Sequence, residues 1–401
     1  MRSFLYRQRI FLITVLALIL VKVGWVAWSC WGNGSFDDEK EDILQRRNYL
    51  VEKIVVEPRQ LMYEMPAGIG LQFKGEWALY SCSMLTEALS NIARLYPETR
   101  DNAIVTIDSL IKIVRSPMLR LYDKVRWGED PLESLEGDNS HVSYLSHLAW
   151  MIGNYRGIGG DDRYNHLHDS ICGTMNRRIM RSPIMNIPTY PGEPVYVPDM
   201  MVAIVALSDY GKLNSGKYSS TVKNWIKRAK TEWLDDETGL LVSFLDDNGK
   251  IDAPVKGSYS TLNCYYLTKI DVAFAKEQYE RMKSSFCQSF PVAGIKEYYD
   301  RSCWAGMDMD AGPIILNLSP SGSAFAIGSA TYFGDDDLRN KLLRTAEIAG
   351  NTIKWGDRRH YLLAEIALVG EAITLAMRTN SIDSHRNFLN SSGRDVSIDN
   401  E

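Results

Sequence analysis

The sequence lacks an excess of basic residues: 50 aspartates and glutamates outnumber 45 lysines and arginines, for a formal net charge of −5. A phosphate backbone requires a positive surface, so this composition argues against a nucleic-acid partner. The six cysteines lie far apart without a CxxC pair, which excludes a zinc knuckle and a thioredoxin-like redox motif. With 45% hydrophobic and 24% charged residues, the chain is too apolar for disorder and too mixed for a polytopic membrane protein. An acidic folded body of one or two domains is expected.

One long hydrophobic run stands near the N-terminus. Residues 10–28 contain a single charged residue, Lys22, and the run approaches the roughly 20 residues that cross a bilayer core. Arginines precede the run and acidic residues follow it at 37–42, so the positive-inside rule predicts residues 1–9 in the cytoplasm and the main domain outside it. We expect residues 10–28 to be a transmembrane signal anchor, with the membrane as a partner. A cleaved signal peptide and lipid attachment at Cys30 are the alternatives.

The rest of the chain is patterned as helix pairs. Apolar residues recur at three- and four-residue spacing, and strand-like alternation is scarce. An apolar helix, a short turn and a more polar helix follow one another five times, at a period of roughly 54 to 64 residues, too long for a common solenoid repeat. A sixth pair can be assembled from helices at about 360–378 and 38–55. We predict an all-α fold, an (α/α)6 toroid over 38–378, and a disordered tail over 379–401; an irregular helical bundle is the alternative.

The predicted site lies where long loops gather. The connections between helix pairs, at about 117–140, 181–198, 235–257 and 288–311, share one end of such a ring, and long loops in compact domains are usually functional. The residues expected to bind substrate are Trp127, Glu129, Glu193, Tyr196 and Trp304, and the loop residues expected in catalysis are Tyr190, Asp199, Tyr259, Asp308 and Asp310. The predicted site is a pocket at this end of the ring, lined by aromatic and carboxyl groups. We expect it to use no metal and no cofactor.

Carboxyl groups and one histidine carry the predicted chemistry, and each has a structural alternative. Asp199 opens an apolar helix after a proline, so it is either a catalytic acid or a helix N-cap. Asp308 and Asp310 are close enough to share a proton, which raises one pKa, but they also suit the cap of a following helix. His147, on a predicted inner helix, either transfers protons or packs as a hydrogen-bonded core residue.

Several stretches together resemble the linalool dehydratase/isomerase family in their order and approximate spacing. They are Asp138 to Leu148, Gly160 to Tyr164, Val197 to Ala203, Ser258 to Thr261, Asp271 to Phe274 and Ser321 to Gly334. The resemblance covers roughly residues 76–375, in patches. It implies an (α/α)6 barrel with its pocket at the long-loop end, a pocket histidine at His147 and a pocket tyrosine at Tyr259. Tyr190 and Asp199 stand where the terpene alcohol enzyme uses two cysteines.

The sequence therefore predicts a linalool dehydratase/isomerase-like enzyme, a lyase or isomerase that acts on a hydroxylated substrate by metal-free acid/base chemistry. Asp199 or the Asp308/Asp310 pair would protonate the leaving oxygen, while His147 or a second carboxylate accepts a proton or activates water. A glycoside hydrolase or other carbohydrate-active (α/α)6 enzyme, using the same acids on a glycosidic bond, is one alternative. The other is a non-catalytic module that holds a glycan or lipid in its aromatic mouth. The oligomeric state is open.

Overall fold

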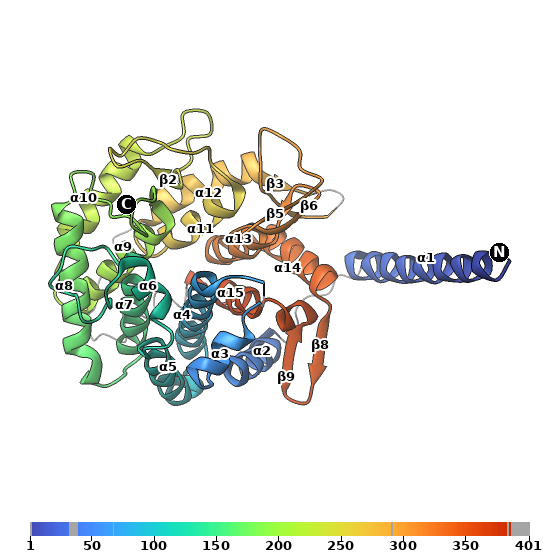
Figure 1. Ribbon diagram of the computed structural model, residues 1–401, viewed down its shortest axis with the longest axis horizontal. Coiled ribbons are helices and arrows are strands. Elements are labelled where there is room, and N and C mark those ends of the chain that lie inside the picture. The colour runs from blue at the N-terminus through green and yellow to red at the C-terminus, as the bar shows by residue number, and fades with distance from the viewer. Residues whose placement is uncertain (1, 32–38, 67, 290–291, 383–384, 386–401) are drawn as a thin grey trace.

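Helices arranged in a ring dominate the computed structural model, which describes residues 2–31, 39–66, 68–289, 292–382 and 385. The inner wall consists of α4 (Leu71–Leu95), α7 (Val142–Gly157), α9 (Val197–Leu213), α11 (Gly257–Leu267), α13 (Pro320–Phe333) and α15 (Leu368–Arg378). Each of these helices packs against the next, and α15 closes the ring against α4 (Figure 1).

A second layer of helices surrounds this wall. It consists of α5 (Arg100–Val114), α8 (Asn165–Arg181), α10 (Ser219–Glu232), α12 (Val272–Phe286), α14 (Asp336–Gly350) and α2 (Glu39–Ile54). The first five each follow the inner helix that they pack against, whereas α2 packs against α15 from the other end of the chain. The predicted ring of helical hairpins, including a sixth pair made from two distant segments, is confirmed.

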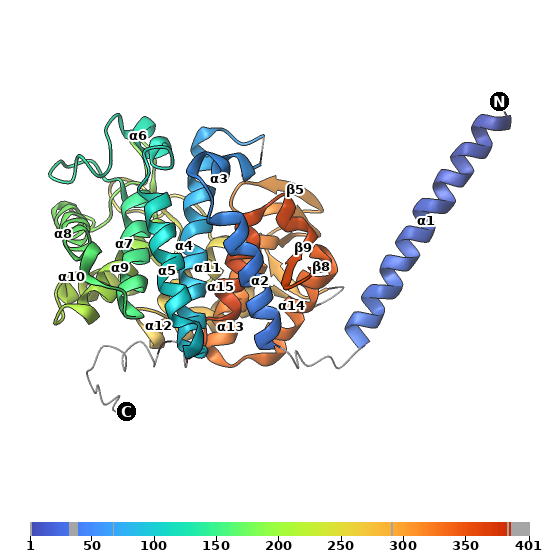
Figure 2. The same cartoon turned by 90° about the horizontal axis from the view of Figure 1, so that it is seen from below.

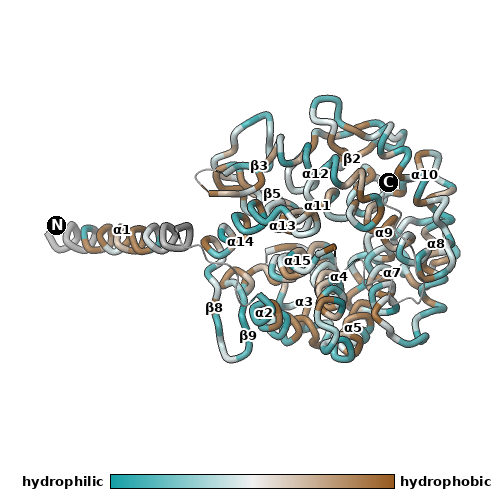
Figure 3. Tube along the Cα trace, turned by 180° about the vertical axis from the view of Figure 1, so that it is seen from behind, coloured by the Kyte–Doolittle hydropathy of each residue, from teal (hydrophilic) through white to brown (hydrophobic). Residues whose placement is uncertain are grey.

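The sequence explains which helices are inside. Every residue of α9 from Met200 to Leu207 is buried, because apolar residues cover the whole circumference of that stretch. On α10 the buried residues recur at three- and four-residue spacing, as expected for a helix with one face on the core. In Figure 3 the outer helices α8 and α10 accordingly show both hydrophilic and hydrophobic segments. Shorter helices lie between these elements: α3 (Pro58–Glu64), η1 (Pro97–Thr99), α6 (Leu121–Trp127) and η2 (Asp162–Tyr164).

The expectation that the fold is entirely α-helical is wrong at three places. β1 (Val195–Tyr196) pairs with β2 (Phe244–Leu245), and β8 (Thr352–Trp355) pairs with β9 (Arg358–Tyr361). A five-stranded antiparallel sheet contains, in spatial order, β3 (Cys287–Gln288), β4 (Gly294–Lys296), β7 (Leu318–Ser319), β6 (Gly312–Ile315) and β5 (Ala305–Asp308). Strands of two to four residues are too short to show a two-residue period in the sequence.

The boundaries of the last inner helix also differ from the prediction. The segment from residue 360 was expected to be helical, but β9 and the short η3 (Leu362–Glu365) come first, and α15 begins at Leu368. Of the tail predicted to be disordered, only 379–382 and 385 are described, and Thr379 and Asn380 are buried there. The rest of that prediction lies outside the described residues.

Helix α1 (Arg2–Trp31) extends away from the ring (Figure 2). Within the described residues, no helix combines the length and the apolar character needed to cross a membrane. This finding corrects the prediction of a transmembrane signal anchor at 10–28. Lys22 places one charge within the run, 12 residues after Ile10. The location of the main domain outside the cytoplasm stays a prediction.

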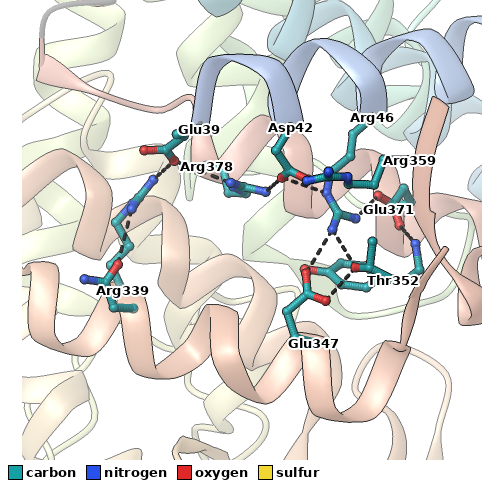
Figure 4. A network of polar contacts seen from close by, with 11 residues as sticks. Glu39, Asp42, Arg46, Arg339, Glu347, Thr352, Arg359, Glu371 and Arg378 are labelled. Atoms are coloured by element: carbon teal, nitrogen blue, oxygen red, sulfur yellow. Dashed lines mark hydrogen bonds and ion pairs between the residues drawn. The ribbon is translucent and has the colours of Figure 1, made fainter. Parts of the chain in front are cut away.

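A buried ionic network joins the two segments that close the ring (Figure 4). Arg46 of α2 is 1% exposed, and its guanidinium donates to Asp42 at 3.0 Å and to Glu371 of α15 at 2.7 Å. Its Nη2 also donates to Glu347 at 3.0 Å and to Thr352 Oγ1 at 2.8 Å. The network further includes Glu39, Arg339, Arg359 and Arg378. The contact between α2 and α15, which we call the seam of the ring, is therefore stabilised by ion pairs as well as by apolar packing.

Candidate active site

The six inner helices all begin at one end of the ring, where the long connections lie; α3, α6 and β5 are seen at this end in Figure 2. Three acidic side chains come from separate elements here. Glu76 lies in the second turn of α4, Asp199 in the first turn of α9, and Asp310 in the turn between β5 and β6. The negative charges of Glu76 and Asp310 both raise the pKa of Asp199, and the charge of Asp310 raises the pKa of Glu76. We call Glu76, Asp199 and Asp310 the acid cluster.

Each member of the acid cluster accepts a hydrogen bond from a neighbouring hydroxyl. Tyr190 donates its phenol proton to Glu76, and Thr189 Oγ1 donates to Asp199 Oδ2 at 2.8 Å. Tyr259 donates its phenol proton to Asp310 Oδ2 at 2.6 Å. The donors come from the loop before β1 and from the first turn of α11, so one long connection and the start of an inner helix position the carboxyl groups.

Burial raises the pKa of every carboxyl group in the acid cluster. It raises the pKa of Asp199, a residue that is 5% exposed, to about 7, and the charges of Glu76 and Asp310 add to this rise. Burial also raises the pKa of Glu76 to about 7. Asp310 keeps part of its surface open to solvent, but the protein atoms around its carboxyl group raise its pKa as well. The site therefore retains protons at neutral pH, and it holds acid and base forms side by side.

Aromatic side chains stand beside the acid cluster. The pairing of β1 with β2 places Tyr196 opposite Phe244, with ring centroids 5.2 Å apart. Both rings pack edge-on against Tyr259, at 5.3 and 5.5 Å. The negative charges of all three carboxyl groups raise the pKa of the Tyr80 phenol on α4. The acids therefore share their surroundings with several phenol rings.

Five of the residues predicted from the sequence are brought together here: Tyr190, Tyr196, Asp199, Tyr259 and Asp310. The N-cap alternative for Asp199 is wrong, because Tyr196 occupies the cap position of α9 and the Asp199 side chain accepts from Thr189 instead.

Asp308 has a different role from the one predicted. Its carboxylate accepts from Lys256 Nζ at 2.8 Å and from the backbone N–H groups of Asp310 and Ala311 at 2.9 and 3.1 Å. Burial acts to raise the pKa of Asp308, but the hydrogen bond from Lys256 and those from the backbone lower it overall. Asp308 is therefore an ionised anchor for the turn of a β-hairpin. It does not cap a helix, and it does not need to share a proton with Asp310.

His147 is buried in the wall of the ring. Its Nδ1 lies 2.8 Å from Ser83 Oγ, and its ring centroid lies 4.5 Å from that of Tyr80. Burial lowers the pKa of His147 to about 3, so the imidazole is neutral in the physiological range. These contacts fit the core alternative, in which His147 is a hydrogen-bonded residue of the ring wall.

The remaining predicted residues surround the acid cluster or lie outside it. Glu193 pairs with Arg126, and its charge adds to the rise in the pKa of Glu76. Trp127 packs against His141 with centroids 5.3 Å apart, and Glu129 accepts from Asn139 at 2.8 Å, so both hold the loop before α7. Trp304 is 79% exposed. No contact links these two loop residues or Trp304 to the acid cluster within the described residues.

Sequence reasoning missed Glu76. A lone carboxylate between Gly75 and Trp77, in a helix that is otherwise mostly apolar near its start, was the available signal. A lone carboxylate of this kind is easily discounted, because the solvent-facing side of a helix normally carries charged residues. Among the described residues, no group of three or more histidine, cysteine, aspartate or glutamate side chains is arranged to hold a metal ion.

The sequence matches no family description and no curated protein. Among solved structures, the fold is similar to an unsaturated glucuronyl hydrolase specific for heparin, with a TM-score of 0.50 and 10% identity over 84% of this chain and 96% of that one. A glycoside hydrolase of family 105 from C. acetobutylicum ATCC 824 gives a TM-score of 0.49 and 11% identity over 74% of this chain and 92% of that one.

Identity this low establishes a shared fold alone. The match gives no support to the prediction of a lyase or isomerase, because the structure that shares the fold is that of a hydrolase. The resemblance to the linalool dehydratase/isomerase family stays a prediction.

Proposed function

We propose that this protein is a carbohydrate-active enzyme that hydrolyses a glycosidic bond with the acid cluster. The observation that carries the proposal is the convergence of Glu76, Asp199 and Asp310, from three separate elements, with the pKa of two of them raised to about 7. Glycosidic hydrolysis requires one carboxylic acid to protonate the leaving oxygen and one carboxylate to assist the attack. The ring shared with an unsaturated glucuronyl hydrolase is consistent with this chemistry.

Asp199 is the proposed general acid. It is the most buried carboxyl group of the cluster, and two neighbouring acids favour its protonated form. In the reaction it gives its proton to the glycosidic oxygen as the bond from that oxygen to the anomeric carbon breaks. An acid with a pKa close to the working pH is effective in this role, because it is protonated often enough and still donates readily.

Asp310 is the proposed general base. It is the more solvated carboxyl group, and the phenol of Tyr259 stabilises its ionised form by a hydrogen bond. It accepts a proton from the attacking water as the water oxygen bonds to the anomeric carbon. The products are a sugar with a new hydroxyl and the protonated leaving group. One proton then passes from Asp310 through solvent to Asp199, and the site is restored.

Glu76 completes the acid cluster without a direct place in this scheme. It accepts from Tyr190 and from Gln72 Nε2, the latter at 3.1 Å. When Glu76 is ionised, its charge favours the protonated form of Asp199. It is therefore a positioning residue for the proton on the general acid.

The test is turnover of an oligosaccharide panel by the full chain and by Asp199→Asn, followed by mass spectrometry in H₂¹⁸O. Hydrolysis places one ¹⁸O in the products, whereas elimination of water from an alcohol places none. We expect Asp199→Asn to lower turnover about 100-fold or more, since general acid catalysis contributes on the order of 10² to 10⁴. The control is Asp337→Asn, which removes an exposed carboxylate paired with Lys341 on α14 and is expected to leave turnover unchanged.

Full activity of Asp199→Asn, with an unchanged circular dichroism spectrum, would refute the proposal. The absence of any product from wild-type protein, together with glycan binding that survives Asp199→Asn and Asp310→Asn, would favour a non-catalytic binding module instead.

A further inference from the structure

The start of α11 holds the hairpin that carries Asp310. Lys256, the cap residue of α11, donates to Asp308 at 2.8 Å, and Tyr259 in the first turn donates its phenol proton to Asp310 Oδ2 at 2.6 Å. Both carboxyl groups belong to the β5–β6 hairpin or its turn. A displacement of this short segment of α11 would therefore move the phenol that hydrogen-bonds to the proposed general base.

Glu297, the residue after β4, binds this segment with both its backbone and its side chain. Its carbonyl oxygen accepts from Gly257 N at 3.0 Å. Its carboxyl group accepts from Ser258 N at 3.1 Å through Oε2 and from Ser258 Oγ at 2.9 Å through Oε1. Each carboxyl oxygen thus has a donor, and both donors belong to the residue directly before Tyr259.

Close packing on two sides leaves the segment little freedom. A Cβ atom on Gly257 would lie 1.9 Å from the carbonyl oxygen of Lys296, so only glycine allows the start of α11 to approach β4 this closely. On the other side, a Cβ atom on Gly322 in the first turn of α13 would lie 3.1 Å from Ser258 Cα. Ser258 is therefore held between β4 and α13, with the carboxyl group of Glu297 on its two donors.

Capping a helix does not by itself require this arrangement. The usual cap is a serine, threonine, aspartate or asparagine at the cap position, whereas the cap residue of α11 is Lys256, whose side chain is bound to Asp308. Glu297 is 0% exposed, and burying a carboxyl group is costly. Burial raises the pKa of Glu297 to about 7, although the hydrogen bonds from Ser258 oppose this rise. A cap at residue 256 would cost less, so this contact suggests a role beyond stability.

We propose that Glu297 is a positioning residue for the general base: by holding Ser258, it places the Tyr259 phenol against Asp310. The hydrogen bond from the phenol favours the ionised form of Asp310, the form that accepts a proton from the attacking water. The effect of Glu297 on turnover rests on the proposed glycoside hydrolysis. The placement of the phenol does not, and it can be measured without turnover.

Other charged groups face Asp310 and set the background for this measurement. The cation of Lys256 favours the ionised form of Asp310, and the negative charge of Asp308 disfavours it. Glu76 and Asp199 are the other acids of the cluster. None of these groups is changed by a substitution at residue 297, so a change in the titration of Asp310 would report the contact with Tyr259.

The first experiment follows that titration by NMR in the full chain labelled with [ζ-¹³C]tyrosine. The Tyr259 signal is the one that disappears in Tyr259→Phe, and in the wild-type chain it should titrate as Asp310 gains its proton. Glu297→Ala removes both side-chain acceptors from Ser258, so the midpoint should rise by about one pH unit. Glu297→Gln keeps an acceptor for the Ser258 N–H, so its midpoint should stay close to that of the wild type.

The second experiment measures turnover of the glycoside that the oligosaccharide panel identifies. Glu297→Ala should lower kcat about 10-fold with little change in KM, because the base is misplaced while the sugar still binds. The acid limb of its kcat/KM profile should move upward by about one pH unit. In a Tyr259→Phe background the same substitution should have no further effect on kcat/KM, because no phenol remains to be placed.

Glu371→Ala is the matched control. Glu371 is another buried carboxyl group that accepts a backbone N–H, that of Tyr361 at 2.9 Å, but it lies at the seam of the ring. Glu371→Ala should lower Tm and leave the Tyr259 titration unchanged. If Glu297→Ala does not fold, Ser258→Ala replaces it in both experiments. That variant removes only the hydroxyl donor, and its midpoint should rise by a smaller amount.

The outcomes separate the two proposals. An unchanged midpoint in Glu297→Ala, or in Ser258→Ala where it replaces that variant, overturns the positioning role. So do equal shifts in Glu297→Ala and Glu297→Gln, or additive losses of kcat/KM in the double variant with Tyr259→Phe. If the wild-type chain hydrolyses no glycoside, the proposed function fails, and the NMR titration alone decides whether Glu297 places the phenol.

Discussion

Replacing Arg46 with methionine is expected to destabilise the ring at its seam by about 3 to 5 kcal/mol. The side chain of Arg46 is buried, and so is that of its partner Glu371, each with 1% of its area exposed. Methionine fills a similar volume but leaves the buried Glu371 without its arginine partner, whereas Asp42 keeps its hydrogen bonds from Arg359 and Arg378. Removing one partner of a buried ion pair is costly because the other charge stays out of water.

The magnitude converts into a melting temperature. An unfolding entropy of about 2.1 cal/mol/K per residue, over a ring of roughly 340 residues, gives about 0.7 kcal/mol/K, so the expected loss lowers Tm by roughly 4 to 7 °C. Differential scanning calorimetry of the full chain measures this shift. Adding Glu371→Gln to Arg46→Met should recover part of it, because the buried negative charge is then gone.

Arg358→Met is the matched control. Arg358 pairs with Glu52 on the surface, with the two side chains 44% and 45% exposed, and an exposed pair contributes about 1 kcal/mol or less. Equal Tm values for Arg46→Met and Arg358→Met would refute the reasoning. So would the absence of any recovery when Glu371→Gln is combined with Arg46→Met.

Three predictions concern pH. The kcat/KM of the wild-type chain should fall as pH rises through about 7, since Asp199 must be protonated to act and its pKa is about 7; a rate that keeps rising to pH 9 would contradict the assignment. Because the folded-state pKa of Asp199 exceeds its ordinary value of 3.8, its ionisation costs stability as pH rises from 4 to 7, so Asp199→Asn should raise Tm at pH 8 and change it little at pH 4. The pKa of Asp42 is lowered to about 2, so its contribution of roughly 2 kcal/mol is present above pH 4 and is lost as pH falls toward 2; Asp42→Asn should flatten this acid limb in a Tm series.

The ring itself could be predicted from the sequence because its cause is local. Apolar residues at three- and four-residue spacing mark each helix, and alternating apolar and more polar helices mark the hairpins. Once the hairpins are in place, every inner helix begins at the long-loop end. Asp199, Tyr259 and Asp310 therefore had to share that end, although their distances and partners could not be read from spacing.

What escaped prediction depends on contacts between distant segments. Glu76 is in ordinary helical sequence, and only the approach of Tyr190 from another loop makes it part of the site. The ion pair of Asp308 could not be read from the sequence, because its partner Lys256 lies 52 residues away and only the fold brings the two together. Asp308 was therefore predicted as a catalytic acid. His147 is neutral because it is buried, and burial is a property of the folded ring.

The pairing of α2 with α15 has a consequence for how this protein is made. Helix α2 is the first member of the ring to leave the ribosome, and its partner is the last. Until α15 emerges, the apolar flank of α4 and that of α13 have no neighbour on one side. A nascent chain halted anywhere before residue 368 would therefore form an incomplete ring with apolar helix surfaces exposed at its edge. Such a chain would depend on chaperones that shield apolar surfaces.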